Sequence, residues 1–167
     1  PMPHPTMKPL ITLSALSLLV LTGAPAIAQS MAHQPLAPSA ASAYPVAPAP
    51  GLFDAFGGQT GIRSLMNDFV NRLKADPRLA EAFREANAAN LASQLSDQIC
   101  QLAGGPCVYK GPDMKEAHSN MDVTRADFNA LVEVLQMSMD ARGIPFARQN
   151  QLLALLAPMH RDVVNVR

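Results

Sequence analysis

The sequence lacks several patterns by which enzymes and nucleic-acid-binding proteins are usually identified. Its 167 residues contain no glycine-rich phosphate loop, no pair of histidines at metal-binding spacing and no strand-borne nucleophile. Basic and acidic residues are balanced, at 13 each, and no run of basic residues is present. We therefore expect no nucleic-acid partner, because such binding needs a basic surface.

Alternation of apolar and polar residues over a useful length, which would indicate a strand, is also absent. Four segments instead repeat apolar residues at helical intervals, and we predict an all-α fold. These residues are Ile62, Leu65, Met66, Phe69, Val70 and Leu73; Leu91, Leu95, Ile99 and Leu102; Phe128, Leu131, Val132, Leu135 and Met139; and Leu152, Leu153, Leu156, Met159 and Val163.

Residues that begin and end helices support this prediction. Gly104 and Gly105 are expected to end the second helix. Thr124 with Asp127 forms a capping-box-like start for the third. Pro158 should kink or loosen the last helix, because proline cannot donate a main-chain hydrogen bond.

The N-terminal segment has the features of a secretory signal. Lys8 precedes an apolar run, and small residues at Ala26 and Ala28 favour cleavage before Gln29. The run is about a dozen residues long, short of the roughly 20 that a membrane-spanning helix needs. We expect a signal peptide at 1–28, a Pro/Ala-rich linker at 29–50 and one domain at 51–167. The mature protein would be periplasmic or secreted, without a membrane partner; an uncleaved surface anchor is the alternative.

The two cysteines, Cys100 and Cys107, lie on either side of the Gly104–Gly105 turn. A reversal of the chain there would bring them together, and in an exported protein a disulfide is plausible. Two buried, unpaired thiols are the alternative.

His118, in "GPDMKEAHSNM", is a candidate metal ligand without a neighbouring histidine. By its own chemistry it is more often a surface residue. One histidine cannot hold zinc, but it can hold haem iron, because the porphyrin supplies four nitrogens and burial of the macrocycle supplies much of the affinity.

Several segments together resemble the group 1 truncated haemoglobins: "LFDAFGG", "DPRLAEAF", "GGPCVYKGPDMKEAH", "DFNALVEVL" and "LLALLAPMHRDVV". The resemblance covers essentially all of residues 51–165 and includes two Gly-Gly pairs at the family's turns. It implies a truncated globin fold, a two-over-two helical sandwich around haem b, with His118 as the proximal iron ligand.

The family pattern also implies the residues around the haem. Phe83, Met114, Phe128 and Leu131 are expected against its proximal side and edge, and Phe69, Val70, Leu91, Leu95 and Ile99 on its distal side. Better-known members carry Tyr where this chain has Val70, and often Gln where it has Leu91 or Leu95. A distal donor favours bound dioxygen by roughly 1–3 kcal/mol, so we expect faster dioxygen release here. Gln94 or Gln98 could swing inward; the alternative is that both face solvent.

The resemblance leaves three functions open. We prefer a five-coordinate haem protein that reversibly binds dioxygen, nitric oxide or carbon monoxide. A nitric-oxide dioxygenase or peroxidase is the alternative; it would need an unidentified reductant or electron donor and favours a polar distal group. A haem-free helical interaction module is the third. His160 is expected on the surface, and Lys110, Lys115 and Arg125 are candidates for the haem propionates. Tyr109 is expected to pack with its hydroxyl in solvent; a distal hydrogen-bonding role is the alternative.

Overall fold

The computed structural model describes residues 47–166. The predicted signal peptide and most of the predicted linker lie outside these residues. Every regular element in the described part is a helix, which confirms the predicted fold class. Its elements are α1 (Leu52–Ala55), α2 (Gly58–Ala75), α3 (Ala88–Leu102), α4 (Met114–His118), α5 (Arg125–Ala141), α6 (Phe146–Leu156), the 3₁₀ helix η2 (Ala157–Met159) and α7 (His160–Val163).

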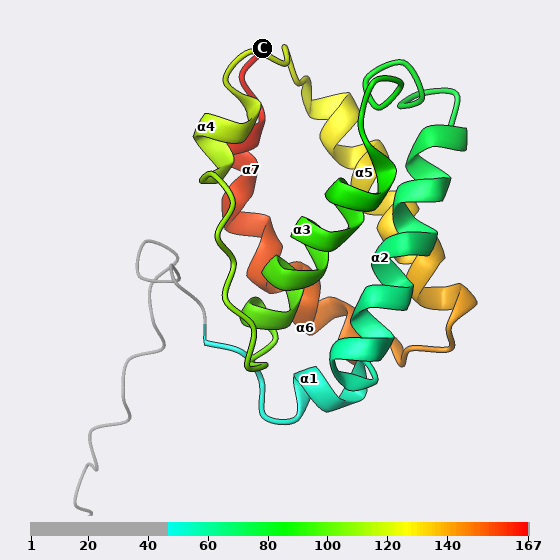
Figure 1. Ribbon diagram of the computed structural model, residues 1–167, viewed down its shortest axis with the longest axis vertical. Coiled ribbons are helices and arrows are strands. Elements are labelled where there is room, and N and C mark those ends of the chain that lie inside the picture. Colours follow the sequence, from blue (N-terminus) through cyan, green and yellow to red (C-terminus); the bar gives the residue numbers. More distant parts are fainter. Residues whose placement is uncertain (1–46, 167) are drawn as a thin grey trace, which may run out of the picture. The chain divides into compact units, whose positions relative to one another are not determined.

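The helices form two stacked pairs, a two-over-two sandwich. Helices α2 and α3 pack against each other and form one pair, and α5 with α6 and its continuation forms the second (Figure 1). Helix α2 also packs on α5, and the short α4 packs on α7. The predicted apolar stripe of α2 is buried throughout: Ile62, Leu65, Met66, Phe69, Val70 and Leu73 are at most 3% exposed.

The predicted ends of the helices are confirmed. Helix α3 ends at Leu102, and Gly104 follows with φ 85°, a left-handed conformation that glycine adopts without strain. A Cβ atom at position 105 would lie 2.5 Å from carbons of the Phe53 ring, which is too close. The main chain at Gly105 therefore approaches Phe53 in a way that only glycine allows. This turn lets the chain leave α3 and pass toward α4.

The capping box and the proline interruption are confirmed too. The Thr124 hydroxyl accepts a hydrogen bond from the Asp127 main-chain N–H, and the Asp127 carboxylate accepts one from the Thr124 N–H. At the other end of the chain α6 stops at Leu156, and the 3₁₀ turn that contains Pro158 separates it from α7. In the part of the chain that the structure describes, no helix is long and apolar enough to cross a membrane.

Candidate functional site

A cavity of about 430 Å³ lies inside the sandwich. Its wall is built by side chains from α2, α3, α4, α5 and the α6–α7 segment, together with the turns that join them. Most of these side chains are apolar. At the C-terminal end of α4, His118 lines the cavity. Asp113, the N-cap at the other end of this helix, does not. The site therefore consists of an apolar chamber with a histidine on one side.

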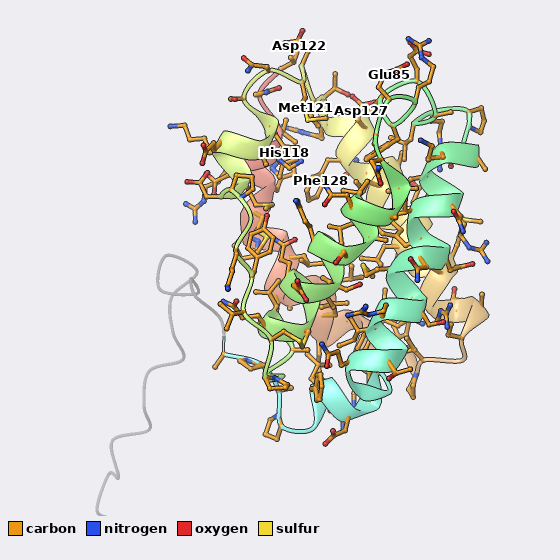
Figure 2. The ribbon with its side chains drawn as sticks, viewed as in Figure 1. Glu85, His118, Met121, Asp122, Asp127 and Phe128 are labelled. Carbon is orange, nitrogen blue, oxygen red and sulfur yellow. A yellow bond between two sulfur atoms is a disulfide. The ribbon has the colours of Figure 1, made fainter. Side chains whose placement is uncertain are left out.

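The His118 ring is oriented by the main chain of its own helix. Its Nδ1 lies 2.7 Å from the Met114 carbonyl oxygen. Because a carbonyl can only accept, Nδ1 is the donor in this contact, and in the neutral ring this leaves the lone pair on Nε2. Metal-ligating histidines are commonly fixed in this way through the nitrogen that does not bind the metal. His118 of α4 and Phe128 of α5 both line the cavity (Figure 2).

Helix α4 is only five residues long and none of its side chains is fully buried, so it depends on hydrogen bonds at its two ends. The Asp113 carboxylate accepts a hydrogen bond from the Glu116 N–H at 2.7 Å and begins the helix. At its other end the Asn165 side-chain amide donates to the His118 carbonyl at 2.7 Å. The C-terminal segment thus fixes the end of α4 that carries the histidine.

The segment between α3 and α4 is also held by specific bonds. Cys100 and Cys107 form a disulfide, which is one of the two arrangements that the sequence left open. The Tyr109 N–H donates to the Gln101 side chain at 2.6 Å, and the Tyr109 hydroxyl donates to the Pro112 carbonyl at 2.9 Å. Burial, with a smaller effect from the charge of Asp113, raises the pKa of Tyr109, so its hydroxyl remains a donor. These bonds lead the chain from the end of α3 to the start of α4.

The wall that α3 contributes is mainly aliphatic. Leu91, Leu95 and Ile99 line it, as expected from the family pattern. Gln94 and Gln98 line it as well, although the alternative considered for both was a solvent-facing position. Gln94 is exposed, but Gln98 is only 8% exposed, and its Nε2 lies 3.5 Å from the Met114 sulfur. One amide of α3 is therefore buried beside the cavity.

All ten predicted site residues lie in the described part of the chain. Eight of them line the cavity, and Val70 and Met114 do not. Val70 is 1% exposed and belongs to the packed core, where its short side chain does not reach the chamber; Met66, Phe69 and Leu73 form the α2 wall instead. Met114 lies on α4 with its sulfur against Gln98 and its carbonyl on His118. The eight that line the cavity are Phe69, Phe83, Leu91, Leu95, Ile99, His118, Phe128 and Leu131.

The expectation for His160 needs correction. His160 is half-buried, and its ring contacts the Phe128 ring edge-on, with centroids 4.8 Å apart, so it is not a free surface residue. Lys110, Lys115 and Arg125 are exposed and lie outside the described lining, and their role as partners of haem propionates stays a prediction. The one carboxylate in that lining is Asp127, and Figure 2 shows Asp122 and Glu85 toward the same end of the molecule.

Further lining residues were not predicted as site residues, although helical spacing had assigned several of them to the core. An apolar stripe gives no signal that distinguishes a cavity wall from a solid core. These residues are Met66, Leu73, Leu79, Ala82, Pro112, Ala117, Met121, Val123, Asp127, Val132, Leu135, Leu156, Met159 and Val163. Tyr109, for which a distal role was the alternative, also lines the cavity.

Three comparisons with known proteins agree with this geometry. Residues 51–165 match the family described as bacterial-like globin. A group 1 truncated haemoglobin of Tetrahymena thermophila is 33% identical over 95 residues, which cover 57% of this chain and 78% of the relative.

Solved structures of similar shape include truncated haemoglobin from Tetrahymena pyriformis in its Fe(III) form. That structure has a TM-score of 0.66 and 25% identity, and the match covers 68% of this chain and 97% of that one. The 2/2 haemoglobin from Synechococcus sp. PCC 7002 has a TM-score of 0.64 at 21% identity, covers 68% and 98% of the two chains, and supports the fold alone.

Proposed function

The chain belongs to the bacterial-like globin family, and from this premise we propose that it binds haem b through His118 and reversibly binds a diatomic gas. When bound, haem supplies an iron atom with a coordination position open to such a ligand. The gas would be dioxygen, nitric oxide or carbon monoxide. The single observation that carries this proposal is the His118 ring, fixed through Nδ1 and placed on the wall of an apolar chamber.

The residues present fit a haem. The chamber of about 430 Å³ is of the size that proteins use for cofactors, and its lining is apolar apart from a few polar groups. Phe69, Phe83 and Phe128 contribute aromatic surface to this lining. His118 Nε2 has the lone pair that an iron ligand needs. Burial of a flat apolar macrocycle here would supply much of the binding energy.

The chemistry of the α3 wall supports a five-coordinate iron. Leu91 and Leu95 line this wall and cannot ligate a metal. Among the described residues that line the cavity, His118 is the one histidine and no cysteine is present, so we assign His118 as the protein ligand. A gas on this wall would meet Leu91 and Leu95 beside the amides of Gln94 and Gln98.

The same wall favours gas binding over redox catalysis. A peroxidase generally needs an acid or base beside the bound peroxide, and a dioxygenase benefits from a polar group there. Leu91 and Leu95 supply neither. The neutral amides of Gln94 and Gln98 can donate hydrogen bonds but cannot act as acid or base, and the Gln98 amide donates to the Met114 sulfur. Without a donor at Leu91 or Leu95, dioxygen should dissociate faster than from a globin that has one there.

The first experiment is an absorption spectrum of the full chain loaded with haem, in the ferric state and then in the ferrous state with and without carbon monoxide. His118→Ala should abolish the histidine-type spectrum. His160→Ala is the matched control, because that histidine packs on Phe128 and is not among the described residues that line the cavity. A haem spectrum that His118→Ala leaves unchanged would contradict the proposal. A six-coordinate low-spin spectrum of the ferrous protein without carbon monoxide would contradict the five-coordinate iron.

We also propose that the protein is exported with cleavage before Gln29. The signal-like N-terminal sequence supports this, and the Cys100–Cys107 disulfide is of the kind that persists in oxidising compartments. Mass spectrometry of protein recovered from the periplasm or medium of the expressing cells should give a chain that begins at Gln29. Recovery of the uncleaved chain from the cytoplasm would refute export.

A further inference from the structure

One side-chain hydrogen bond crosses from the α3 wall of the cavity to the helix that carries His118. Gln98 Nε2 on α3 donates to Met114 Sδ on α4 across 3.5 Å. A thioether sulfur is a weak acceptor, but a buried amide without a partner costs free energy. If α3 and α4 moved apart, Gln98 would lose this partner, so the bond favours the observed separation of the two helices. Gln98 is 8% exposed, which keeps water from replacing the sulfur easily.

Met114 is also the residue that orients the His118 ring. Its carbonyl oxygen accepts from His118 Nδ1 at 2.7 Å, while its sulfur accepts from Gln98. One residue therefore connects the amide of α3 with the imidazole of α4. A displacement of Met114 would shift the point on which the imidazole is fixed.

The other anchors of α4 act from different directions. Asn165 holds the His118 carbonyl from the C-terminal segment, and Asp113 caps the helix locally. The disulfide and Tyr109 hold the segment that precedes the helix. Within the described residues, Gln98 is the side chain of the α3 wall whose hydrogen bond reaches α4 itself.

We propose that Gln98 is a positioning residue for His118, acting through Met114 to hold α4 at a fixed distance from the α3 wall. This inference rests on the proposed function, because it assumes that His118 ligates haem iron. Gln98 acts on the iron only through Met114. The consequence is that a movement of α3 when a ligand enters the chamber is transmitted to the imidazole through Met114.

The test is Gln98→Met, which keeps the length of the side chain and removes the donor. In the full chain without haem, amide hydrogen exchange at Ala117 and His118 should become about two- to tenfold faster, as expected for the loss of one hydrogen bond. In the haem-loaded chain the iron–histidine stretching band should shift or broaden, and haem transfer to an acceptor apoglobin should accelerate by a similar factor.

Gln94→Met is the matched control, because Gln94 lies one turn earlier on α3 and lines the same cavity. It should not change the exchange of the α4 amides. Met114→Leu removes the acceptor and should reproduce the effect of Gln98→Met. The double variant Gln98→Met/Met114→Leu should then show no further change, because both substitutions break one interaction.

Two outcomes would overturn the inference alone. In one, the haem-loaded parent has its histidine spectrum but Gln98→Met leaves the α4 exchange rates and the iron–histidine band as they were. In the other, Gln94→Met changes the α4 exchange as much as Gln98→Met does. A parent chain that binds haem without using His118 would overturn the proposed function and this inference with it.

Discussion

The two sides of the cavity are built by different means. The α2–α3 side consists of long helices, and the α2 stripe within it is almost completely buried in the core. The α4 side is a five-residue helix with no fully buried side chain, fixed by a disulfide and a set of individual hydrogen bonds. Hydrophobic burial holds the first side, and specific tethers hold the second.

This difference separates two properties of the site. Under the proposed function, residues on the α3 wall decide what a bound gas meets, and the hydrogen bonds that hold α4 decide where His118 lies. Substitutions in the core of α2 should reduce the stability of the whole domain. Substitutions on the exposed face of α4 should change stability little, whereas loss of its tethers should change the placement of His118.

The largest expected effect comes from the α2 core. Leu65 is fully buried, so Leu65→Ala should lower the free energy of unfolding by about 2–5 kcal/mol through lost burial and a remaining cavity. Lys115→Ala, on the exposed face of α4, should change it by less than about 0.5 kcal/mol. Urea unfolding of the full chain measures both. Equal losses in the two variants would show that the two sides do not differ in this way.

The disulfide should have the next largest effect. Replacing both Cys100 and Cys107 by Ser should lower the free energy of unfolding by roughly 2–3 kcal/mol in the chain-entropy model of a short loop. Urea unfolding with and without a reductant provides the measurement: the parent should lose stability on reduction, and the double variant should not respond. A titration that finds two free thiols in the unfolded, oxidised parent would refute the bridge.

A polar group on the α3 wall should slow dioxygen release. Leu95→Gln introduces a donor into the lining and should reduce the dissociation rate of dioxygen about five- to hundredfold, the effect of roughly 1–3 kcal/mol. Carbon monoxide should respond much less. Leu102→Gln is the control, because Leu102 is half-buried on the same helix and outside the described lining. Flash photolysis and stopped flow measure the rates; no change with Leu95→Gln would mean that this position does not face the gas.

The smallest expected effect concerns the start of α5. Thr124→Ala removes the N-cap and should cost about 1 kcal/mol at pH 7. Hydrogen bonds from the Thr124 side chain and main chain hold the pKa of Asp127 below its ordinary value and outweigh the opposing effect of burial.

Because the pKa of Asp127 is depressed in the folded state, its contribution is present above about pH 4 and disappears as the pH falls through that lower pKa. The difference in unfolding free energy between parent and Thr124→Ala should therefore shrink in strong acid. A difference that stays constant down to pH 2 would show that the carboxylate is not involved.

Local features of the sequence predicted most of the fold. The burial of the α2 stripe, the turn at Gly104, the capping box of Thr124 and Asp127 and the interruption at Pro158 all follow from the preferences of neighbouring residues. The resemblance to truncated haemoglobins identified His118 as the candidate ligand. The helices and their ends depend on residues close together in the chain, whereas the assignment of His118 depends on a pattern spread over residues 51–165.

The tertiary structure decided which apolar residues enclose a chamber and which fill the core. Periodicity placed Phe69 and Val70 on the same stripe, yet only Phe69 lines the cavity. The contact of Gln98 with Met114 and that of Asn165 with the His118 carbonyl join residues 16 and 47 positions apart. Such contacts depend on how whole helices are placed against one another. The sequence by itself determined the helices and the histidine, and packing determined the chamber and the bonds that fix the ring.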